Sequence, residues 1–237
     1  NTAPTWSLFY HFKFLIATRR FFDAYEQKNF MEIIKYHKYR LMFIVALGTG
    51  LRTGELVAIK WSNLNFENGT LKVNKAISRV YKNIEGKRKI VLEETSPKTR
   101  TSIRKIPFPI NILNELIEYK KERDFYIEKY KDVYEDRDFI FTDSLGKFIL
   151  PDTLSKAYLK ILRDNNINHK SFHSLRHTYA TRLFEKGVPL KTVQKLLGHS
   201  SIKIKAVIYT HVISNEKIIA VEKIKIYLYN ILIINLN

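Results

Sequence analysis

Residues 171–199 read SFHSLRHTYATRLFEKGVPLKTVQKLLGH, and this stretch predicts the helices that carry the most informative residues of the chain. Ser171 is a suitable N-cap for a first helix, which Gly187 closes. Pro189 opens a second helix, because proline fits the first helical turn. The second helix ends at Leu197–Gly198, since glycine adopts the left-handed turn that terminates many helices.

The first of these helices places two polar side chains on one face. His173 and Arg176 are three positions apart, which brings their Cβ atoms within ~5–6 Å of each other. Such pairs are also common on solvent-exposed faces, so the spacing alone does not indicate a site. We interpret the neighbouring His177 as a structural histidine, packed or hydrogen-bonded inside the protein. His199 projects from the reversal at Gly198, and the alternative interpretation is a polar residue that only ends the helix.

A second polar segment lies far upstream, where residues 49–55 read TGLRTGE. Its glycines allow the backbone to approach a ligand closely, and the Arg52 guanidinium can then reach a phosphate group. The alternative is a surface arginine that pairs with Glu55 at i,i+3.

Two further candidates depend on their context. Tyr209 lies in the run IYTH at residues 208–211, but the chain has 14 tyrosines and most tyrosines belong to the core or the surface. Lys98 is predicted at the tip of a hairpin. That hairpin also carries Arg100, Arg104 and Lys105, so the choice of one lysine is ambiguous.

The composition favours a folded protein with a polyanionic partner. Hydrophobic residues make up 45% of the 237 residues, which is enough for a substantial core. There are 41 Lys and Arg against 23 Asp and Glu, so the formal net charge is 41 − 23 = +18. A backbone of phosphates is the commonest partner for such a charge, and the alternative is a basic protein that binds no polyanion. The chain has no cysteine, which excludes disulfides, thiol nucleophiles and thiolate zinc sites.

Hydrophobic spacing predicts a mainly α protein with a small antiparallel β-sheet, an α+β fold. Helical spacing begins near residue 25 and returns after residue 109, with strands predicted between residues 64 and 108. Asn68–Gly69 and Gly86 mark hairpin turns. A third turn is expected at residues 96–100, between strands at 89–94 and 102–106, and one more short strand at 138–142.

We expect three segments along the chain. Residues 1–24 are an arm or the remnant of an upstream segment, residues 25–223 form the catalytic domain, and residues 224–237 form a tail. The tail either packs on its own core or docks on a neighbouring protomer. We expect no span of a membrane, because the apolar stretches at 41–47 and 224–236 are shorter than the ~20 residues that a span requires.

One acidic run raises the possibility of a metal site. Metal-dependent nucleases need clustered carboxylates, and the densest cluster here is formed by Asp132, Glu135, Asp136 and Asp138. We interpret this run as a solvated turn before a strand, and a two-metal mechanism is the least favoured one. No metal and no cofactor are therefore expected.

Taken together, these segments closely resemble the phage-integrase family of tyrosine recombinases. The run at residues 49–55 resembles the first arginine box of that family. The His-x-x-Arg of residues 173–176, the Leu-Gly-His of residues 197–199 and the Ile-Tyr-Thr-His of residues 208–211 resemble its second box and its nucleophile segment, in the same order. The resemblance covers about residues 25–225.

The resemblance implies a role for each matched position. The catalytic set would be Arg52, Lys98, His173, Arg176, His199 and Tyr209. The supporting set would be Glu55 and His177. Family members of this type carry a helical DNA-binding domain upstream, so we expect the chain by itself to clamp DNA poorly.

The chemistry implied is attack of a phenol on a phosphodiester without metal or ATP. Two arginines would stabilise the charge of the pentacoordinate transition state. His173 would take the proton of Tyr209, Lys98 would protonate the leaving 5′ oxygen, and His199 would hold a phosphate oxygen. We expect the loss of Arg176 to abolish cleavage with little loss of fold.

We therefore predict a site-specific tyrosine recombinase that integrates or excises a phage or mobile element through a 3′-phosphotyrosine intermediate. One alternative is a Xer-like resolvase of chromosome or plasmid dimers, and another is a type IB topoisomerase, which relaxes supercoils. A non-enzymatic alternative is a silent DNA-binding remnant. The expected partners are double-stranded DNA and further copies of the chain, as a tetramer on DNA, in a prokaryotic cytoplasm and associated with the nucleoid.

Overall fold

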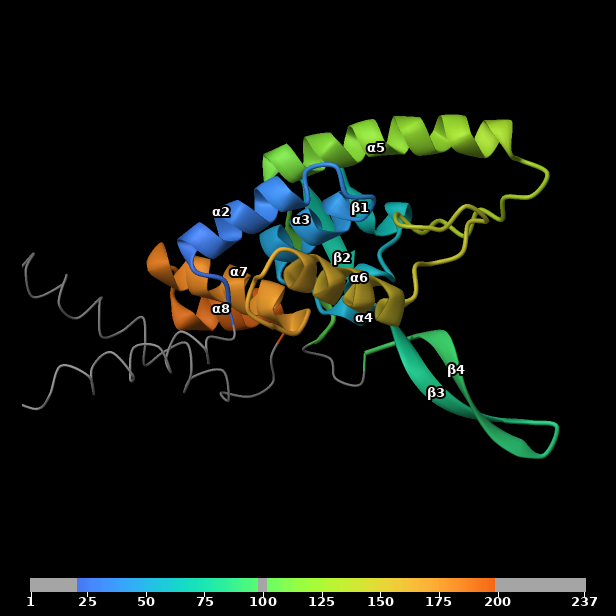
Figure 1. Cartoon of the computed structure of the whole chain (residues 1–237). Coiled ribbons are helices and arrows are strands. Elements are labelled where there is room, and N and C mark those ends of the chain that lie inside the picture. Colours follow the sequence, from blue (N-terminus) through green and yellow to red (C-terminus); the bar gives the residue numbers. More distant parts are fainter. Residues whose placement is uncertain (1–20, 98–101, 199–237) are drawn as a thin grey trace, which may run out of the picture.

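The computed structural model describes residues 21–97 and 102–198. The described helices are α2 (Ala24–Ile33), α3 (Arg40–Thr49), α4 (Thr53–Leu56), α5 (Ile110–Lys129), α6 (Pro151–Asp164), α7 (His173–Glu185) and α8 (Leu190–Leu197), with a 3₁₀ turn η1 (Trp61–Asn63). The described strands are β1 (Leu64–Asn65), β2 (Thr70–Val73), β3 (Ala76–Ile84), β4 (Lys87–Thr95) and β5 (Arg104–Pro107). The predicted α+β class is confirmed, with helices grouped at one end and a long hairpin at the other (Figure 1).

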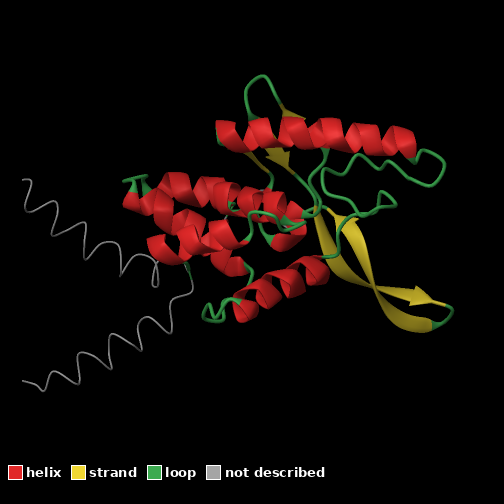
Figure 2. Ribbon diagram, turned by 45° about the horizontal axis from the view of Figure 1, so that its top comes forward, coloured by secondary structure: helices red, strands yellow, loops and turns green. Residues whose placement is uncertain are grey.

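The strands form two antiparallel sheets, whereas we predicted one. One sheet has the order β1-β2-β5 and the other is the β3–β4 hairpin. Strand β5 pairs with β2, with Val73 opposite Arg104, so strands 89–94 and 102–106 do not pair with each other as predicted. The β3–β4 hairpin is therefore an insertion between two paired strands, and it extends away from the helices (Figure 2).

Both predicted hairpin turns are present. At the first turn Gly69 has φ 58°, and the side chain of Asn65 accepts a hydrogen bond from the backbone of Asn68. At the second turn Glu85 and Gly86 both have positive φ, 54° and 74°. Two consecutive positive φ angles give the turn whose twist matches that of the flanking strands. The residues of each turn were therefore enough to predict that turn.

An aromatic cluster forms the centre of the helical core. Phe22 stacks on Phe30 at 5.1 Å between ring centroids, and Phe30 lies edge-on to Phe43 at 5.8 Å. Tyr158 of α6 meets Phe172 edge-on at 5.4 Å. These side chains are all buried, and α3, which carries Phe43, packs against α7. The cluster thus fixes the start of α7, which carries His173 and Arg176 in its first turn.

The segment that leads into α2 is hydrogen-bonded to helix α7. The backbone N–H of Phe22 donates to the hydroxyl of Thr178 at 2.9 Å, and Arg182 donates to the carbonyl of Phe22 at 3.0 Å. Lys170, which precedes α7, forms a part-buried ion pair with Glu26 at 2.7 Å. Helix α7 is therefore bonded to the incoming chain through Thr178 and Arg182.

Two local predictions were wrong. Ser171 does not cap α7: Phe172 occupies the N-cap position, and no side chain caps the helix there. Residues 138–142 make only isolated bridges, Lys60 to Phe139 and Thr142 to Phe148. The backbone φ of Asp138 is +66°, which interrupts an extended strand, and the apolar residues after it are buried for packing.

Replacement of Phe43 by alanine should lower the free energy of unfolding by about 3–5 kcal/mol, because it removes a fully buried ring from the aromatic cluster. Phe125→Ala is the matched control, since the Phe125 side chain is 75% exposed on α5 and should change stability little. Urea unfolding measures both variants. Equal losses would contradict the placement of the core.

Candidate active site

Arg52 stands at the N-cap position of α4 and points its guanidinium in two directions. Its Nη1 donates to the Glu55 carboxylate at 2.8 Å, and its backbone N–H donates to the same carboxylate at 2.9 Å. Its Nη2 donates to the carbonyl of Gly198 at 3.4 Å. The pair with Glu55 that we considered as an alternative to a functional arginine therefore exists. It orients Arg52 towards the end of α8, and the Arg52 side chain keeps 36% of its surface exposed.

Arg176 reaches the same place from α7. Its Nη1 donates to the carbonyl of Gly50 at 2.6 Å and its Nη2 to the carbonyl of Leu197 at 2.5 Å. The side chain is buried, with 2% of the residue exposed. Its Nε has no hydrogen-bond acceptor among the described residues. Arg52 and Arg176, which the sequence placed far apart, therefore meet at the C-terminal end of α8.

The burial of Arg176 changes one expectation. We expected that loss of this side chain would spare the fold. However, its removal would leave the carbonyls of Gly50 and Leu197 without their donors in a buried place, which costs stability. Loss of activity and loss of stability therefore cannot be separated with an alanine variant at this position.

Gly50 needs to be glycine for two reasons. Its φ of +64° lies in the left-handed region, which side chains rarely adopt. A Cβ atom at Gly50 would lie 2.5 Å from Cδ1 of Tyr179 and 2.8 Å from Cδ2 of Leu197. The close packing of this turn against α7 and α8 is what lets its carbonyl accept from Arg176.

The sequence analysis missed the role of a third arginine. Arg104 counted only as one of several basic residues of the hairpin, yet it lies on β5 and is buried. It donates to both carboxylate oxygens of Glu55, at 3.1 and 3.0 Å, and its Nε donates to the carbonyl of Leu196 at 2.7 Å. The burial of β5 alternates, with Arg104 and Ile106 inside. Alternate residues of a strand face the same side, so Arg104 lies on the same face as the apolar Ile106. This alternation could have predicted the burial of Arg104 from the sequence.

Glu55 is held in its charged form. Burial by itself would raise its pKa, but hydrogen bonds and charges from Arg104 and Arg52 outweigh burial and bring the pKa to about 2. Because this pKa is lower than in the unfolded chain, the ion pair stabilises the fold above pH 4.5, and this contribution is lost as the pH falls towards 2. Glu55 therefore orients Arg52 and binds Arg104, and its supporting role in the reaction stays a prediction.

His173 is exposed at the start of α7, next to the two cations. Its ring meets the ring of His177 edge-on at 4.8 Å between centroids. Partial burial lowers the pKa of His173, and His177, Arg176 and Arg52 lower it further by repulsion. An imidazole with a lowered pKa is neutral at pH 7 and is able to accept a proton. His177 is half-buried beside it, which fits a supporting residue.

Three predicted residues lie outside the described residues: Lys98, His199 and Tyr209. The structure fixes the residues that flank two of them. His199 follows Gly198, which ends α8 in the left-handed conformation predicted for it, with φ 64° and ψ 48°. Lys98 precedes Ser102, whose carbonyl accepts a hydrogen bond from Arg104 at 3.1 Å.

The acidic run does not converge on one point. Asp136 pairs with Arg123 at 2.6 Å, and the Asp138 carboxylate accepts from the hydroxyl of Ser62 at 2.5 Å. Glu135 pairs with Arg137. Within residues 21–97 and 102–198, no group of three or more His, Asp or Glu side chains is arranged to hold a metal ion.

Over the described part of the chain, no helix combines the length and the apolar character that crossing a membrane requires.

Comparisons with known proteins identify the family. Residues 20–216 match the model of the phage integrase family, and the chain belongs to that family. It is 43% identical over 205 residues to a "Tyrosine recombinase XerC-like" of Caldanaerobacter subterraneus subsp. tengcongensis, which covers 85% of this chain and 52% of that protein. It is 33% identical over 169 residues to the integrase of Staphylococcus phage L54a, which covers 69% of this chain and 45% of that protein.

Solved structures share the fold. The Tn1549 transposon integrase in complex with transposon right end DNA superposes with a TM-score of 0.65 at 23% identity, over 80% of this chain and 61% of that one. XerA recombinase superposes with a TM-score of 0.59 at 19% identity, over 79% and 59%. The fold is therefore that of a tyrosine recombinase catalytic domain. The chain spans about half the length of these two curated relatives.

The protonation of His173 gives a test of the site. In an NMR titration of the free protein, its imidazole should have a midpoint below the ordinary value of 6.5, and Arg52→Gln should raise that midpoint because it removes one neighbouring cation. Arg79→Gln is the control, since Arg79 lies on the exposed hairpin and pairs with Asp152. The lowered pKa also means that this group reduces stability as the pH falls below 6.5. A midpoint at or above 6.5 would contradict the described surroundings of His173.

Proposed function

We propose that this chain is the catalytic part of a site-specific DNA recombinase, which breaks and rejoins DNA strands through a bond to Tyr209. The observation that carries the proposal is the meeting of Arg52 and Arg176 at the end of α8, with exposed His173 beside them. Two fixed cations and a neutral imidazole form a suitable site for a phosphodiester and for the base that activates its attacker.

The reaction proceeds by exchange of one phosphate ester for another. His173 takes the proton of the Tyr209 hydroxyl, whose oxygen then bonds to phosphorus, and the bond from phosphorus to the 5′ oxygen breaks. Lys98 gives its proton to that oxygen, so the products are a 3′-phosphotyrosine and a free 5′-hydroxyl. The reverse reaction with a 5′-hydroxyl from another strand rejoins the DNA. No ATP is consumed, because the covalent intermediate keeps the phosphodiester energy.

The arginines stabilise the negative charge of the transition state. The pentacoordinate transition state gathers negative charge on the non-bridging oxygens, and guanidinium groups donate to such oxygens in pairs. Arg52 and Arg176 keep their charge at neutral pH, so neither needs to titrate during the reaction. His199 adds a hydrogen bond to the same phosphate.

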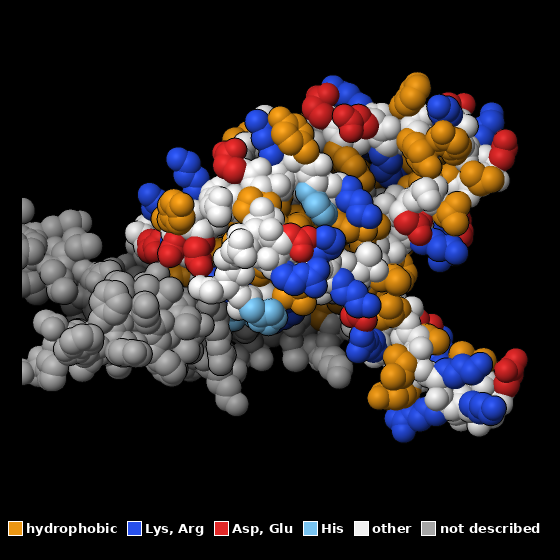
Figure 3. All heavy atoms as spheres, in the orientation of Figure 1, with side chains coloured by type: hydrophobic (Ala, Val, Ile, Leu, Met, Phe, Trp, Pro, Cys, Tyr) orange, Lys and Arg blue, Asp and Glu red, His pale blue; other side chains and the backbone are white. Residues whose placement is uncertain are grey.

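The substrate of the reaction is double-stranded DNA. The formal charge of +18 supports this partner. Figure 3 shows Lys and Arg side chains on the described surface, some grouped next to histidine in the middle of the face and others on the β3–β4 hairpin. Exchange between two duplexes requires a cut in each of four strands, so four copies of the chain act together. The protein works at the nucleoid of a prokaryotic cell.

The biological role is integration or excision of a phage or mobile element, as in the relative from phage L54a. A Xer-like resolvase is the second candidate, because the relative with 43% identity carries a XerC-like name. The two roles differ in the DNA sites that they join. Recombination between the two ends of an element supports the first role, and resolution of a chromosome or plasmid dimer at its two copies of one site supports the second.

The decisive experiment uses a duplex that is nicked beside the cut site, so that the released fragment diffuses away and the intermediate is trapped. The full chain should form a covalent adduct with this DNA, and Tyr209→Phe should form none, because it lacks the attacking oxygen. Denaturing electrophoresis measures the adduct. DNA binding without an adduct over a wide range of pH and time would favour the silent DNA-binding remnant.

The contribution of the positive charge to DNA binding can be tested separately. Raising the salt concentration from 50 to 200 mM should weaken DNA binding by about 10³-fold or more if at least six phosphates are contacted. Fluorescence anisotropy with a labelled duplex measures the dissociation constant at each salt concentration. A dissociation constant that stays constant with salt would show that the cations of the chain do not bind the phosphate backbone.

A further inference from the structure

Arg104 has the most complete set of hydrogen bonds of the arginines at this site. Its Nη1 and Nη2 donate to the two oxygens of Glu55, its Nε donates to the carbonyl of Leu196, and Nη1 also donates to the carbonyl of Ser102. Only 5% of its side chain is exposed. A guanidinium used in this way is not available to DNA, so its function must act through the groups that it holds.

Those groups belong to three of the segments that supply the site. Glu55 lies on α4, three residues after Arg52. Leu196 lies in the last turn of α8, which leads through Gly198 to His199. Ser102 ends the connection that contains Lys98. Arg104 is therefore the one described side chain that bonds to all three segments.

The Glu55 carboxylate is shared between two arginines of different exposure. Its Oε1 accepts from Nη1 of Arg52 at 2.8 Å and from Nη1 of Arg104 at 3.1 Å. Its Oε2 accepts from the backbone of Arg52 at 2.9 Å and from Nη2 of Arg104 at 3.0 Å. Without Arg104, Arg52 would be the only cation bonded to this buried carboxylate among the described residues. Glu55 would then hold the Arg52 guanidinium more strongly and away from a phosphate.

The charge of the site leads to the same conclusion. The site has a net charge of 3 − 1 = +2, because it contains three arginines and one carboxylate: Arg52, Arg104, Arg176 and Glu55. Loss of Arg104 halves that charge, although Arg104 itself touches no substrate. The transition state of phosphoryl transfer would then be stabilised less.

We propose that Arg104 is a positioning residue of the recombinase site: it balances the charge of Glu55 so that Arg52 stays free for the phosphate, and it holds the last turn of α8, to which Arg52 and Arg176 also bond. This role rests on the proposed DNA cleavage. It also gives a reason for a buried cation on a strand whose other inward residues are apolar.

The test measures single-turnover cleavage of the nicked duplex at saturating DNA, together with the dissociation constant for DNA. Arg104→Met should reduce the cleavage rate by about 10²-fold, as expected when a catalytic group is misplaced by about 1 Å. Its DNA affinity should change by less than about threefold, because Arg104 makes no phosphate contact. Arg104→Lys keeps the charge but not the forked donors, so its rate should lie between those of Arg104→Met and the unchanged chain.

Two control variants separate positioning from stability. Lys72→Met changes an exposed cation on β2, the strand that pairs with β5, and should leave the cleavage rate unchanged. Phe43→Ala destabilises the core that supports α7, so its cleavage rate below its melting temperature measures the effect of lost stability alone. All variants are compared at a temperature where circular dichroism shows them folded. If Arg104→Met does not fold at any temperature, the rate of Arg104→Lys decides.

The outcomes distinguish this proposal from the proposed function. No adduct with the unchanged chain means that the proposed cleavage is wrong. An adduct with the unchanged chain and a normal rate for folded Arg104 variants overturns the role of Arg104 alone. The same holds if the Arg104 variants and Phe43→Ala slow the rate equally, since stability would then explain both. A loss that is specific to Arg104, with DNA affinity kept, supports the positioning role.

Discussion

The last turn of α8 receives three guanidinium groups, and the rest of the site depends on this interaction. Arg104 donates to the carbonyl of Leu196, Arg176 to that of Leu197 and Arg52 to that of Gly198. The final carbonyls of a helix have no partner within the helix and carry partial negative charge. The helix end therefore attracts cations that would otherwise repel one another. Arginines from β5, α7 and the start of α4 are thus brought to one place.

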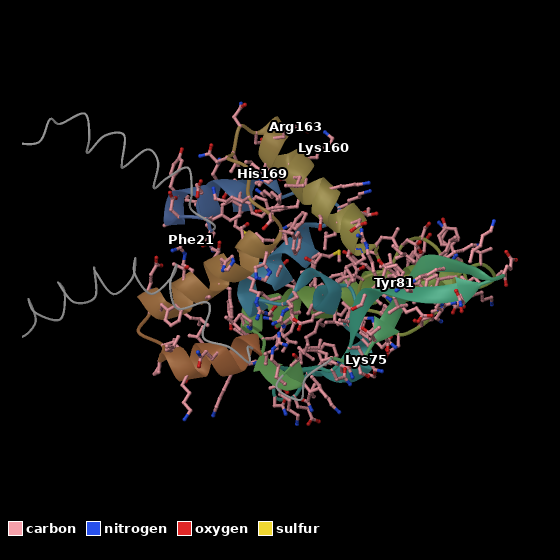
Figure 4. All side chains as sticks on the ribbon, turned by 90° about the horizontal axis from the view of Figure 1, so that it is seen from below. Phe21, Lys75, Tyr81, Lys160, Arg163 and His169 are labelled. Carbon is pink, nitrogen blue, oxygen red and sulfur yellow. The ribbon has the colours of Figure 1, made fainter. Side chains whose placement is uncertain are left out.

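This constraint explains why some parts of the site could be predicted from the sequence and others could not. The glycine that ends α8, the hairpin turns at Gly69 and Gly86 and the helical face shared by His173 and Arg176 are local properties. They follow from backbone conformation and from the helical repeat. The pairing of β5 with β2 brings together residues on either side of the inserted β3–β4 hairpin, which carries Tyr81 (Figure 4). No local pattern at residues 89–106 indicates that pairing.

For the arginines, too, local features could be predicted from the sequence and long-range partners could not. The sequence suggested two uses for Arg52, a surface pair with Glu55 or a phosphate contact, as if one excluded the other. In the structure Glu55 also binds Arg104, so its charge is shared and the pair with Arg52 serves to orient that side chain. Arg104 could have been placed inside by the alternation of β5, but its partners on α4 and α8 are distant in sequence. Likewise, the burial of Arg176 follows from the packing of α7 against α3 and α8.

The same cations link the proposed base to the proposed phosphate site. Burial lowers the pKa of His173, and Arg176 and Arg52 lower it further by repulsion, so its imidazole is neutral at pH 7. A phosphate that binds between the arginines brings negative charge, which offsets this repulsion and makes the imidazole more basic when the substrate is in place. Arg176 is already fixed by two carbonyls before any substrate arrives, so most of the reorganisation is completed during folding. A site built in this way favours proton transfer only when a phosphodiester occupies it.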